Sequence, residues 1–153
     1  MRKTLILVLV LMVGIAMGAL WGNKVLNAAP AVSPIAVETK GQHPTIKFEQ
    51  VLSGHLKDVN GKYKMRITEV ILDPGGYVSE HQHRGPGVRS ITAGELTITE
   101  EGKTRVYKAG DYFFEAGDIT NRADNKGAVP VTNVQCELLP SDLTGGSGFV
   151  PPR

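Results

Sequence analysis

The sequence predicts an all-β domain, a closed barrel of two sheets with short strands, preceded by an N-terminal hydrophobic helix. Its 153 residues suit one domain. The 18 Gly and 9 Pro are many for this length, and after residue 30 they separate short runs rich in Val, Ile, Thr, Tyr and Phe, as turns separate strands. Eight such runs without a long amphipathic pattern favour a double-sheet barrel and exclude helical arrays.

Residues 1–28 predict an export segment, either a signal peptide or a membrane anchor. Arg2 and Lys3 precede 18 uncharged residues at 4–21. A helix of 18 residues rises about 27 Å, close to the roughly 30 Å hydrocarbon core, which favours a retained transmembrane helix. The small residues at 27–29 instead permit cleavage. Both alternatives place the domain outside the cytoplasmic membrane, in the periplasm or an equivalent compartment, either anchored by residues 4–21 or released.

Three further segments follow the export segment. Residues 29–44 predict an extended linker, because they are rich in Ala, Pro and Val without periodicity. The barrel is expected over residues 45–140, followed by an irregular Gly- and Pro-rich tail at 141–153. Within the barrel, strands are predicted at Lys47–Leu56, Lys64–Leu72, Gly76–His83, Val88–Thr99, Thr104–Lys108, Tyr112–Glu115, Thr120–Ala123 and Val129–Leu138.

Turn signals justify the boundaries between these strands. Asn60-Gly61 closes the first loop, and Asp73-Pro74-Gly75-Gly76 separates the second predicted strand from the third. Glu101-Gly102 lies between two alternating runs and predicts a tight hairpin. Asn125-Lys126-Gly127 precedes the last strand.

Charge and cysteine content exclude two classes of protein. The net charge is only +2, and no cluster of Lys and Arg is interleaved with aromatic residues, so a nucleic-acid partner is not expected. Cys136 is the only cysteine, so the barrel has no internal disulfide. We expect Cys136 to be a small buried hydrophobic residue.

Two histidines separated by one residue form the main candidate site. On a strand, His81 and His83 point to the same face, as a shared metal ion would require, although ordinary barrel histidines have the same spacing. Gly75, His81, His83 and Gly94 resemble the first motif of the cupin family, with its glycine, two histidines and closing glycine turn.

The second cupin motif has its counterpart further along the chain. Gly110-Asp111, the aromatic strand 112–114, the turn 115–118 and Asn125 resemble its glycine, strand, turn and terminal asparagine. The resemblance covers roughly residues 65–138 and is to single-domain cupins of type 2. It implies a double-stranded β-helix, the jelly-roll barrel of this family.

The resemblance implies a metal centre that this sequence carries only in part. Family members typically use two histidines and a glutamate of the first motif and a histidine of the second. Here Gly87 stands at the glutamate position and Asn121 at the second-motif histidine position, which leaves His81 and His83. The implied cofactor is a divalent transition metal, Fe, Mn, Ni or Zn, with Glu115 as the candidate third ligand; otherwise no cofactor is expected.

An arginine offers a second interpretation of the same cavity. Counting in twos from Gly87 places Arg89 on the inner face. Beside the histidines and Asn121, it would bind a carboxylate or phosphate through paired hydrogen bonds. Alternatively, Arg89 faces outward or pairs with an acid such as Glu95.

Aromatic residues complete the candidate ligand site. Tyr77 and Phe113 are expected to line it, because ligand pockets favour apolar walls at the mouths of barrels. Neighbours on a strand alternate faces, so only one of Phe113 and Phe114 should point inward.

These residues leave three functions open. The leading prediction is an exported barrel that binds a small polar or carboxylate-bearing molecule, which a cavity too small for a ligand would contradict. The alternative is a metal-dependent enzyme of the dioxygenase or isomerase type, favoured if Glu115 reaches both histidines. The third is a structural or partner-binding module, favoured if aromatic side chains fill the cavity. The resemblance also implies a homodimer, and no catalytic residue is assigned.

Overall fold

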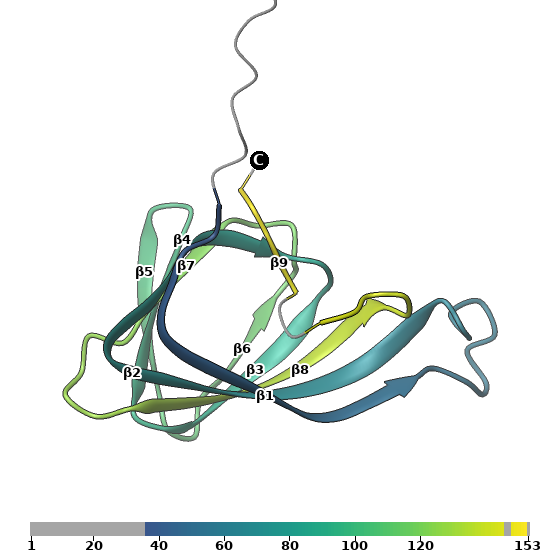
Figure 1. Ribbon diagram of the computed structural model, residues 1–153, viewed down its shortest axis with the longest axis horizontal. Coiled ribbons are helices and arrows are strands. Elements are labelled where there is room, and N and C mark those ends of the chain that lie inside the picture. Colours follow the sequence, from purple (N-terminus) through teal and green to yellow (C-terminus); the bar gives the residue numbers. More distant parts are fainter. Residues whose placement is uncertain (1–35, 146–147, 153) are drawn as a thin grey trace, which may run out of the picture. The chain divides into compact units, whose positions relative to one another are not determined.

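The computed structural model describes residues 36–145 and 148–152, and this part of the chain consists mainly of β-strands (Figure 1). The export segment at 1–28, with its expected helix, lies outside the described residues. Among the described residues, no helix is long and apolar enough to cross a membrane. The strands are β1 Thr39–Val51, β2 Tyr63–His83, β3 Gly87–Ala93, β4 Glu95–Glu100, β5 Lys103–Lys108, β6 Tyr112–Glu115, β7 Asn121–Asp124, β8 Val131–Pro140 and β9 Phe149–Val150.

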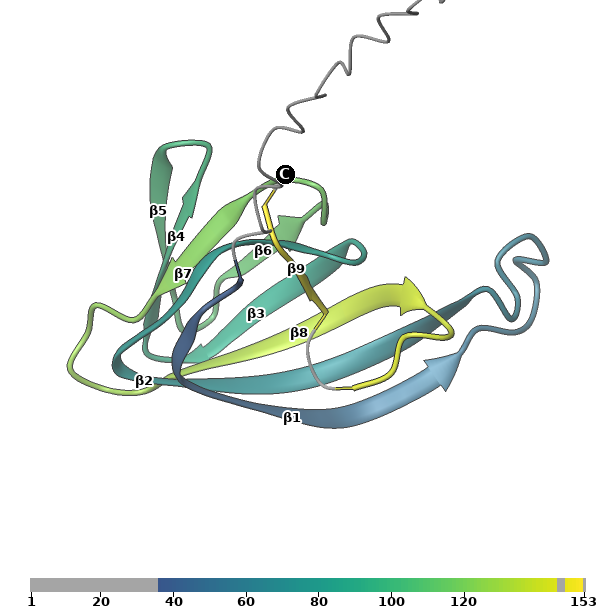
Figure 2. The same ribbon diagram turned by 45° about the horizontal axis from the view of Figure 1, so that its top comes forward.

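The strands curl into a nearly closed antiparallel barrel, which confirms the all-β prediction (Figures 1 and 2). Their order is β5-β4-β7-β2-β8-β3-β6, and β1 and β9 also pair with β2. The first half of β2 pairs with β1 and β8. Its second half pairs with β7, with the start of β1 and with β9. This one long strand therefore connects the two sides of the barrel.

Glycines explain why two predicted strand boundaries were wrong. The predicted strands 64–72 and 76–83 form the single strand β2, because Gly75 at φ 69° lets the chain bend without leaving the sheet. The predicted strand 88–99 is instead divided into β3 and β4 at Gly94, whose φ is 74°. A Cβ at Gly94 would lie 2.6 Å from the carbonyl oxygen of Pro130, so only glycine fits this turn.

The first strand also begins earlier than the sequence indicates. β1 starts at Thr39, so residues 39–44 of the expected linker belong to the sheet, and it ends at Val51 rather than at Leu56. The start of β1 pairs with Tyr77 and Val78, and its remainder pairs with the first half of β2. This long-range pairing offsets the weak strand propensity of a segment that contains Gly41 and Pro44.

The inner side of the barrel has an apolar part and a charged part. Leu72, Ile91, Leu96, Ile98 and Val131 form the buried apolar core. Near the other end of the first half of β2, Lys64 and Arg66 point inward and form ion pairs with Glu49 of β1, at 3.0 and 2.7 Å. Buried charges of this kind need partners, and here neighbouring strands supply them.

One outer face of the barrel is unusually apolar for a solvated antiparallel sheet. Strand pairing places one row of side chains across five strands: Phe48 of β1, Ile67 of β2, Cys136 of β8, Val88 of β3 and Phe114 of β6. We call this the outer apolar row. Phe114 is 63% exposed. Cys136 is half-buried in this row rather than fully buried in the core, because its inward neighbours on β8 are Gln135 and Glu137.

Candidate functional site

Four polar side chains from four strands meet inside the barrel. His83 of β2, Arg89 of β3, Glu115 of β6 and Glu137 of β8 are all buried, and Arg89 is only 1% exposed. The register of the strands explains why these side chains lie together. Glu115 of β6 and Glu137 of β8 both pair with Gly87 of β3, which lies two residues before Arg89 and on the same face of the strand. We call these four side chains the ion cluster.

Arg89 holds the ion cluster together. Its Nε lies 2.6 Å from Oε2 of Glu115, and its Nη2 donates a hydrogen bond of 3.0 Å to Oε1 of Glu137. The His83 ring lies between the same carboxylates, with Nε2 3.2 Å from Glu115 and Nδ1 3.4 Å from Glu137. Arg89 is thus inside the barrel, and its acid partners are Glu115 and Glu137, whereas Glu95 pairs with Lys108.

His83 and Arg89 together keep the buried carboxylate of Glu137 ionised. Burial by itself would raise the pKa of Glu137, but the hydrogen bond with His83 and the charge of Arg89 outweigh it and hold this pKa below the ordinary value of 4.5. Glu115 makes no well-aligned hydrogen bond through Oε2 among the described residues. Its attraction to Arg89 is therefore mainly coulombic.

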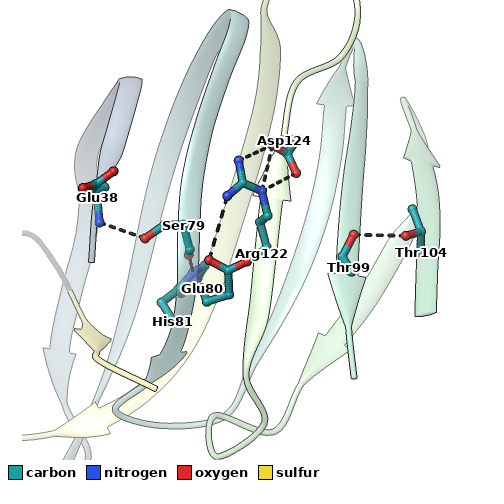
Figure 3. A network of polar contacts seen from close by, with 8 residues as sticks. All are labelled: Glu38, Ser79, Glu80, His81, Thr99, Thr104, Arg122 and Asp124. Carbon is teal, nitrogen blue, oxygen red and sulfur yellow. Dashed lines mark hydrogen bonds and ion pairs between the residues drawn. The ribbon is translucent and has the colours of Figure 1, made fainter. Parts of the chain in front are cut away.

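His81 points to the same side as His83 but stands outside the ion cluster. The two ring centroids lie 4.9 Å apart. Nδ1 of His81 lies 2.7 Å from the carbonyl oxygen of Ser79 (Figure 3), so Nδ1 carries the proton and Nε2 is left as an acceptor. Burial, together with the charge of His83, lowers the pKa of His81 from 6.5 to about 4. His81 is therefore a neutral hydrogen-bond acceptor at neutral pH.

The cavity between these groups is small because the protein's own rings occupy it. Its volume is about 30 Å³, which holds about two water molecules. The Phe149 ring of β9 lies 4.5 Å from the His81 ring and 5.5 Å from the His83 ring. Phe113 lines the cavity and stacks on Tyr107 at 4.2 Å. Its apolar walls include Val70, Leu72, Val78, Leu96, Ile98 and Val131.

Three polar atoms of residues at the cavity lack hydrogen-bond partners. Nη1 of Arg89, Oδ1 of Asn133 and Oε2 of Glu115 are buried, and none has a hydrogen-bond partner within residues 36–145 and 148–152. All three residues line the cavity. Leaving such atoms unpaired costs about 1 to 3 kcal/mol each, and the residues that line the cavity carry one unpaired donor and two unpaired acceptors.

The remaining predicted residues are divided between the inside and the outside. Asn121 is buried and pairs with His81 across β7 and β2, but it does not line the cavity. Phe113 points inward and Phe114 outward, as their alternation predicts. Tyr77 instead lines a groove on the outer surface, where the guanidinium of Arg122 lies 4.9 Å from its ring centroid.

The groove beside Tyr77 already satisfies its own charges. Arg122 makes hydrogen bonds of 2.8 to 3.1 Å with Asp124 and lies 3.9 Å from Glu80 (Figure 3). Hydrogen bonding to Asp124 raises the pKa of this arginine further. Because Tyr77 lies on the outer face of β2, the sheet separates it from His81 and His83, which point inward.

The sequence interpretation missed three residues of the site. Glu137 and Asn133 alternate with apolar residues on β8, and an acid at an inward position of such a strand is a readable signal of a buried ion pair. Phe149 gave no comparable signal, since it lies in a short segment rich in Gly and Pro. Only its pairing with β2 places it over the histidines.

The arrangement of His81, His83 and Glu115 does not suit a divalent metal ion. Glu115 contacts His83, as a third ligand should, but its carboxylate is paired with Arg89. A metal ion at this carboxylate would lie next to the guanidinium and be repelled by it. Across the described ranges, no group of three or more His, Cys, Asp or Glu side chains has a geometry suited to a metal ion.

Comparisons with known proteins agree with the barrel. Residues 68–134 match the family model described as Cupin domain. A search of curated protein sequences finds no match. The fold resembles a protein with a double-stranded β-helix domain from Klebsiella pneumoniae, with a TM-score of 0.54 and 18% identity over 73% of this chain and 84% of that one.

Two further solved structures illustrate the spread of similar proteins. KdgF from Halomonas sp. has a TM-score of 0.50 and 15% identity over 65% of this chain and 84% of that one. A conserved protein of unknown function from Streptococcus pyogenes has a TM-score of 0.45 and 20% identity, and the alignment covers 50% of this chain and 65% of that one. At identities of 18% and 15%, the likeness to the Klebsiella and Halomonas structures shows the fold alone, and function is argued from the site.

Proposed function

We propose that this barrel, whose residues 68–134 match the family model described as Cupin domain, binds a small neutral polar molecule in the space that the Phe149 ring now fills. The observation that carries this proposal is the pair of buried, unpartnered polar atoms on Arg89 and Asn133 at an otherwise apolar cavity. A hydroxyl or amide group can accept from Arg89 and donate to Asn133 or to the neutral His81.

Charge favours a neutral ligand over a carboxylate. Arg89 is already paired with the carboxylates of Glu115 and Glu137. The ion cluster has no net positive charge even when His83 is protonated, because two acids balance the two bases. An anionic ligand would gain little from Arg89 and would be repelled by both acids.

The ligand must displace Phe149. Small-molecule sites have volumes of about 300 to 1,000 Å³, whereas this cavity has about 30 Å³. The closed barrel is thus too small for an organic ligand, which contradicts the leading sequence prediction for this state of the barrel, and the Phe149 ring beside the histidines favours a structural or partner-binding module. Ligand binding therefore requires an open state in which β9 has left β2. Among the described residues, β9 is held to β2 by two residue pairs, Gln82 with Val150 and His83 with Phe149, and beside them the backbone N–H of Arg84 donates a hydrogen bond of 2.9 Å to the carbonyl oxygen of Gly148. Displacing β9 would expose both imidazoles and leave the other strands paired.

The proposal can be tested with benzyl alcohol, which combines a ring of the size of Phe149 with one hydroxyl. We expect the Phe149→Ala chain to bind it more tightly than wild type, measured by calorimetry on the purified full-length protein in detergent. Benzoate has the same ring with a carboxylate and should bind at least about tenfold more weakly, a difference of about 1.4 kcal/mol.

The matched control is Phe114→Ala, which removes an exposed ring from the outer face. This variant should bind benzyl alcohol no better than wild type. Adding His81→Ala to Phe149→Ala should weaken binding, because the acceptor is lost. Equal binding by the Phe149→Ala and Phe114→Ala variants, or a preference for benzoate, would refute the proposal.

We also propose that the domain acts outside the cytoplasmic membrane, as residues 1–28 indicate. The 18 uncharged residues at 4–21 support this location. Protease added to spheroplasts should digest the barrel, while a cytoplasmic marker protein stays intact. Protection of both proteins would contradict export, and release of the barrel by osmotic shock would distinguish a cleaved leader from an anchor.

A second candidate function is partner binding, and the outer apolar row favours it. This row is continuous across five strands and includes Phe48 at 48% and Phe114 at 63% exposure. We propose that the partner is a second copy of the chain. An apolar row of this kind is complementary to itself under a two-fold axis, so the same residues would be covered on both copies.

A further inference from the structure

We propose that the guanidinium of Arg89 takes the place of a divalent metal ion in this barrel, as a permanent internal cation. The proposal is independent of ligand binding and concerns what holds Glu115 and the histidine pair in position. It rests on three features of the described residues: the partners of Arg89, the space above Gly87 and the orientation of His81.

The partners of Arg89 are those that a metal would compete for. Its Nε lies 2.6 Å from the Glu115 carboxylate, and its Nη2 lies 3.2 Å from Nδ1 of His83 and 3.0 Å from Glu137. The guanidinium therefore holds Glu137 by a hydrogen bond and Glu115 by coulombic attraction at the same time. A metal ion could reach Glu115 only by displacing a cation that is covalently attached to β3.

The space above Gly87 shows that the guanidinium occupies a defined position. A Cβ at Gly87 would lie 2.4 Å from Nη1 of Arg89 and 2.8 Å from the carbonyl oxygen of Cys136. Gly87 stands where the resemblance implies a glutamate ligand. An acid there would also meet Glu115 and Glu137, its paired residues on both neighbouring strands. Gly87 therefore leaves open the space above the strand that the guanidinium of Arg89 occupies.

The orientation of His81 shows what remains of a metal-binding arrangement. Its Nδ1 is bonded to the carbonyl oxygen of Ser79 at 2.7 Å, which leaves Nε2 as the free acceptor, as in metal-ligating histidines. His83 lies beside it and beside Glu115. Removing the guanidinium should free Glu115 and convert these three side chains into a metal site.

The test compares Co²⁺ binding by full-length wild type and by the double variant Arg89→Met with Glu137→Gln. Methionine removes the cation at similar volume, and glutamine avoids leaving a second buried acid unpaired. We expect no stoichiometric Co²⁺ in wild type. The variant should gain visible Co²⁺ absorption bands and an affinity higher by about 100-fold or more, since freeing one ligand and removing an adjacent cation should each contribute at least about tenfold.

A matched control assigns the gained metal to the site. The same double variant with His81→Ala and His83→Ala should lose the Co²⁺ bands. A folded double variant that binds no better than wild type would overturn the proposal, since the guanidinium would not then be what excludes the metal. Stoichiometric Co²⁺ in wild type that disappears in His81→Ala with His83→Ala would also overturn it. If the double variant does not fold, the wild-type measurement can still overturn the proposal, because stoichiometric Co²⁺ bound by His81 and His83 would show that the guanidinium does not exclude the metal.

Discussion

Acidification should destabilise the barrel through His81. The pKa of His81 is lowered from 6.5 to about 4, and at about 1.4 kcal/mol for each tenfold change in proton affinity this difference corresponds to about 3 kcal/mol. The unfolded chain binds the proton near pH 6.5, but the folded chain does so only near pH 4. The free energy of unfolding is therefore highest above pH 6.5 and falls until the pH reaches about 4.

The groups around His81 do not share this pH window. His83 and Arg89 disfavour its protonated form through their charge, and Glu115 partly opposes them. Glu137 has a pKa below 4.5, so its contribution is present above that pH and is lost only below it. Between pH 6.5 and 4.5, the loss of stability should come mainly from His81.

Urea unfolding followed by circular dichroism at several pH values measures this loss. His81→Gln removes the titrating group, so its free energy of unfolding should be nearly constant where that of wild type declines. His55→Gln, at an exposed loop position, controls for the removal of an imidazole elsewhere and should retain the decline. Parallel curves for wild type and His81→Gln would refute the role of His81.

Three further predictions follow from contacts elsewhere in the barrel. Gly94→Ala should lower the free energy of unfolding, measured in urea, by about 3 kcal/mol, and Gly102→Ala should lower it by about 1 kcal/mol. Both glycines have positive φ, but only at Gly94 would the added Cβ meet a backbone carbonyl. Equal losses in the two variants would contradict this reasoning. Asn125→Ala should lower the free energy of unfolding by about 2 to 4 kcal/mol by the same method, because the Asn125 side chain makes three hydrogen bonds to the backbone. A loss below about 1 kcal/mol would contradict this prediction. Phe114→Lys places a charge in the outer apolar row and should shift sedimentation toward the monomer. Val106→Lys on β5, outside this row, is the control and should not shift it. A monomeric wild type would exclude the dimer.

The sequence predicted which side chains face the cavity better than it predicted their partners. Strand alternation correctly predicted that His81 and His83 share a face and that only one of Phe113 and Phe114 points inward, because period two is a local property of the backbone. For Arg89 it left an inward and an outward alternative, and the structure shows the inward one. The boundaries at Gly75 and Gly94 were wrongly predicted because a glycine can either bend a strand or end it. The outcome depends on which strands lie alongside, and local pattern does not contain that information.

Partners depend on register between strands that are distant in the sequence. Arg89 meets Glu137 only because β3 pairs with β8, whereas Glu95 on β4 faces Lys108 on β5. Tyr77 was expected near the histidines, but it lies on the outward side of β2. A pattern of alternating residues shows that a face is buried and leaves open which residue of another strand arrives there.

The role of β2 on both sides of the barrel has a consequence for biosynthesis. Tyr63 pairs with Pro140, so this end of β2 gains its β8 partner only after 77 further residues have been made. At about 5 to 20 residues per second, that interval is about 4 to 15 seconds. During it, the β8-facing edge of β2 is unpaired and open to chaperones or to strands of other chains. The nascent chain therefore emerges with one edge of β2 unpaired, so chaperones or other chains can bind this edge before the barrel folds.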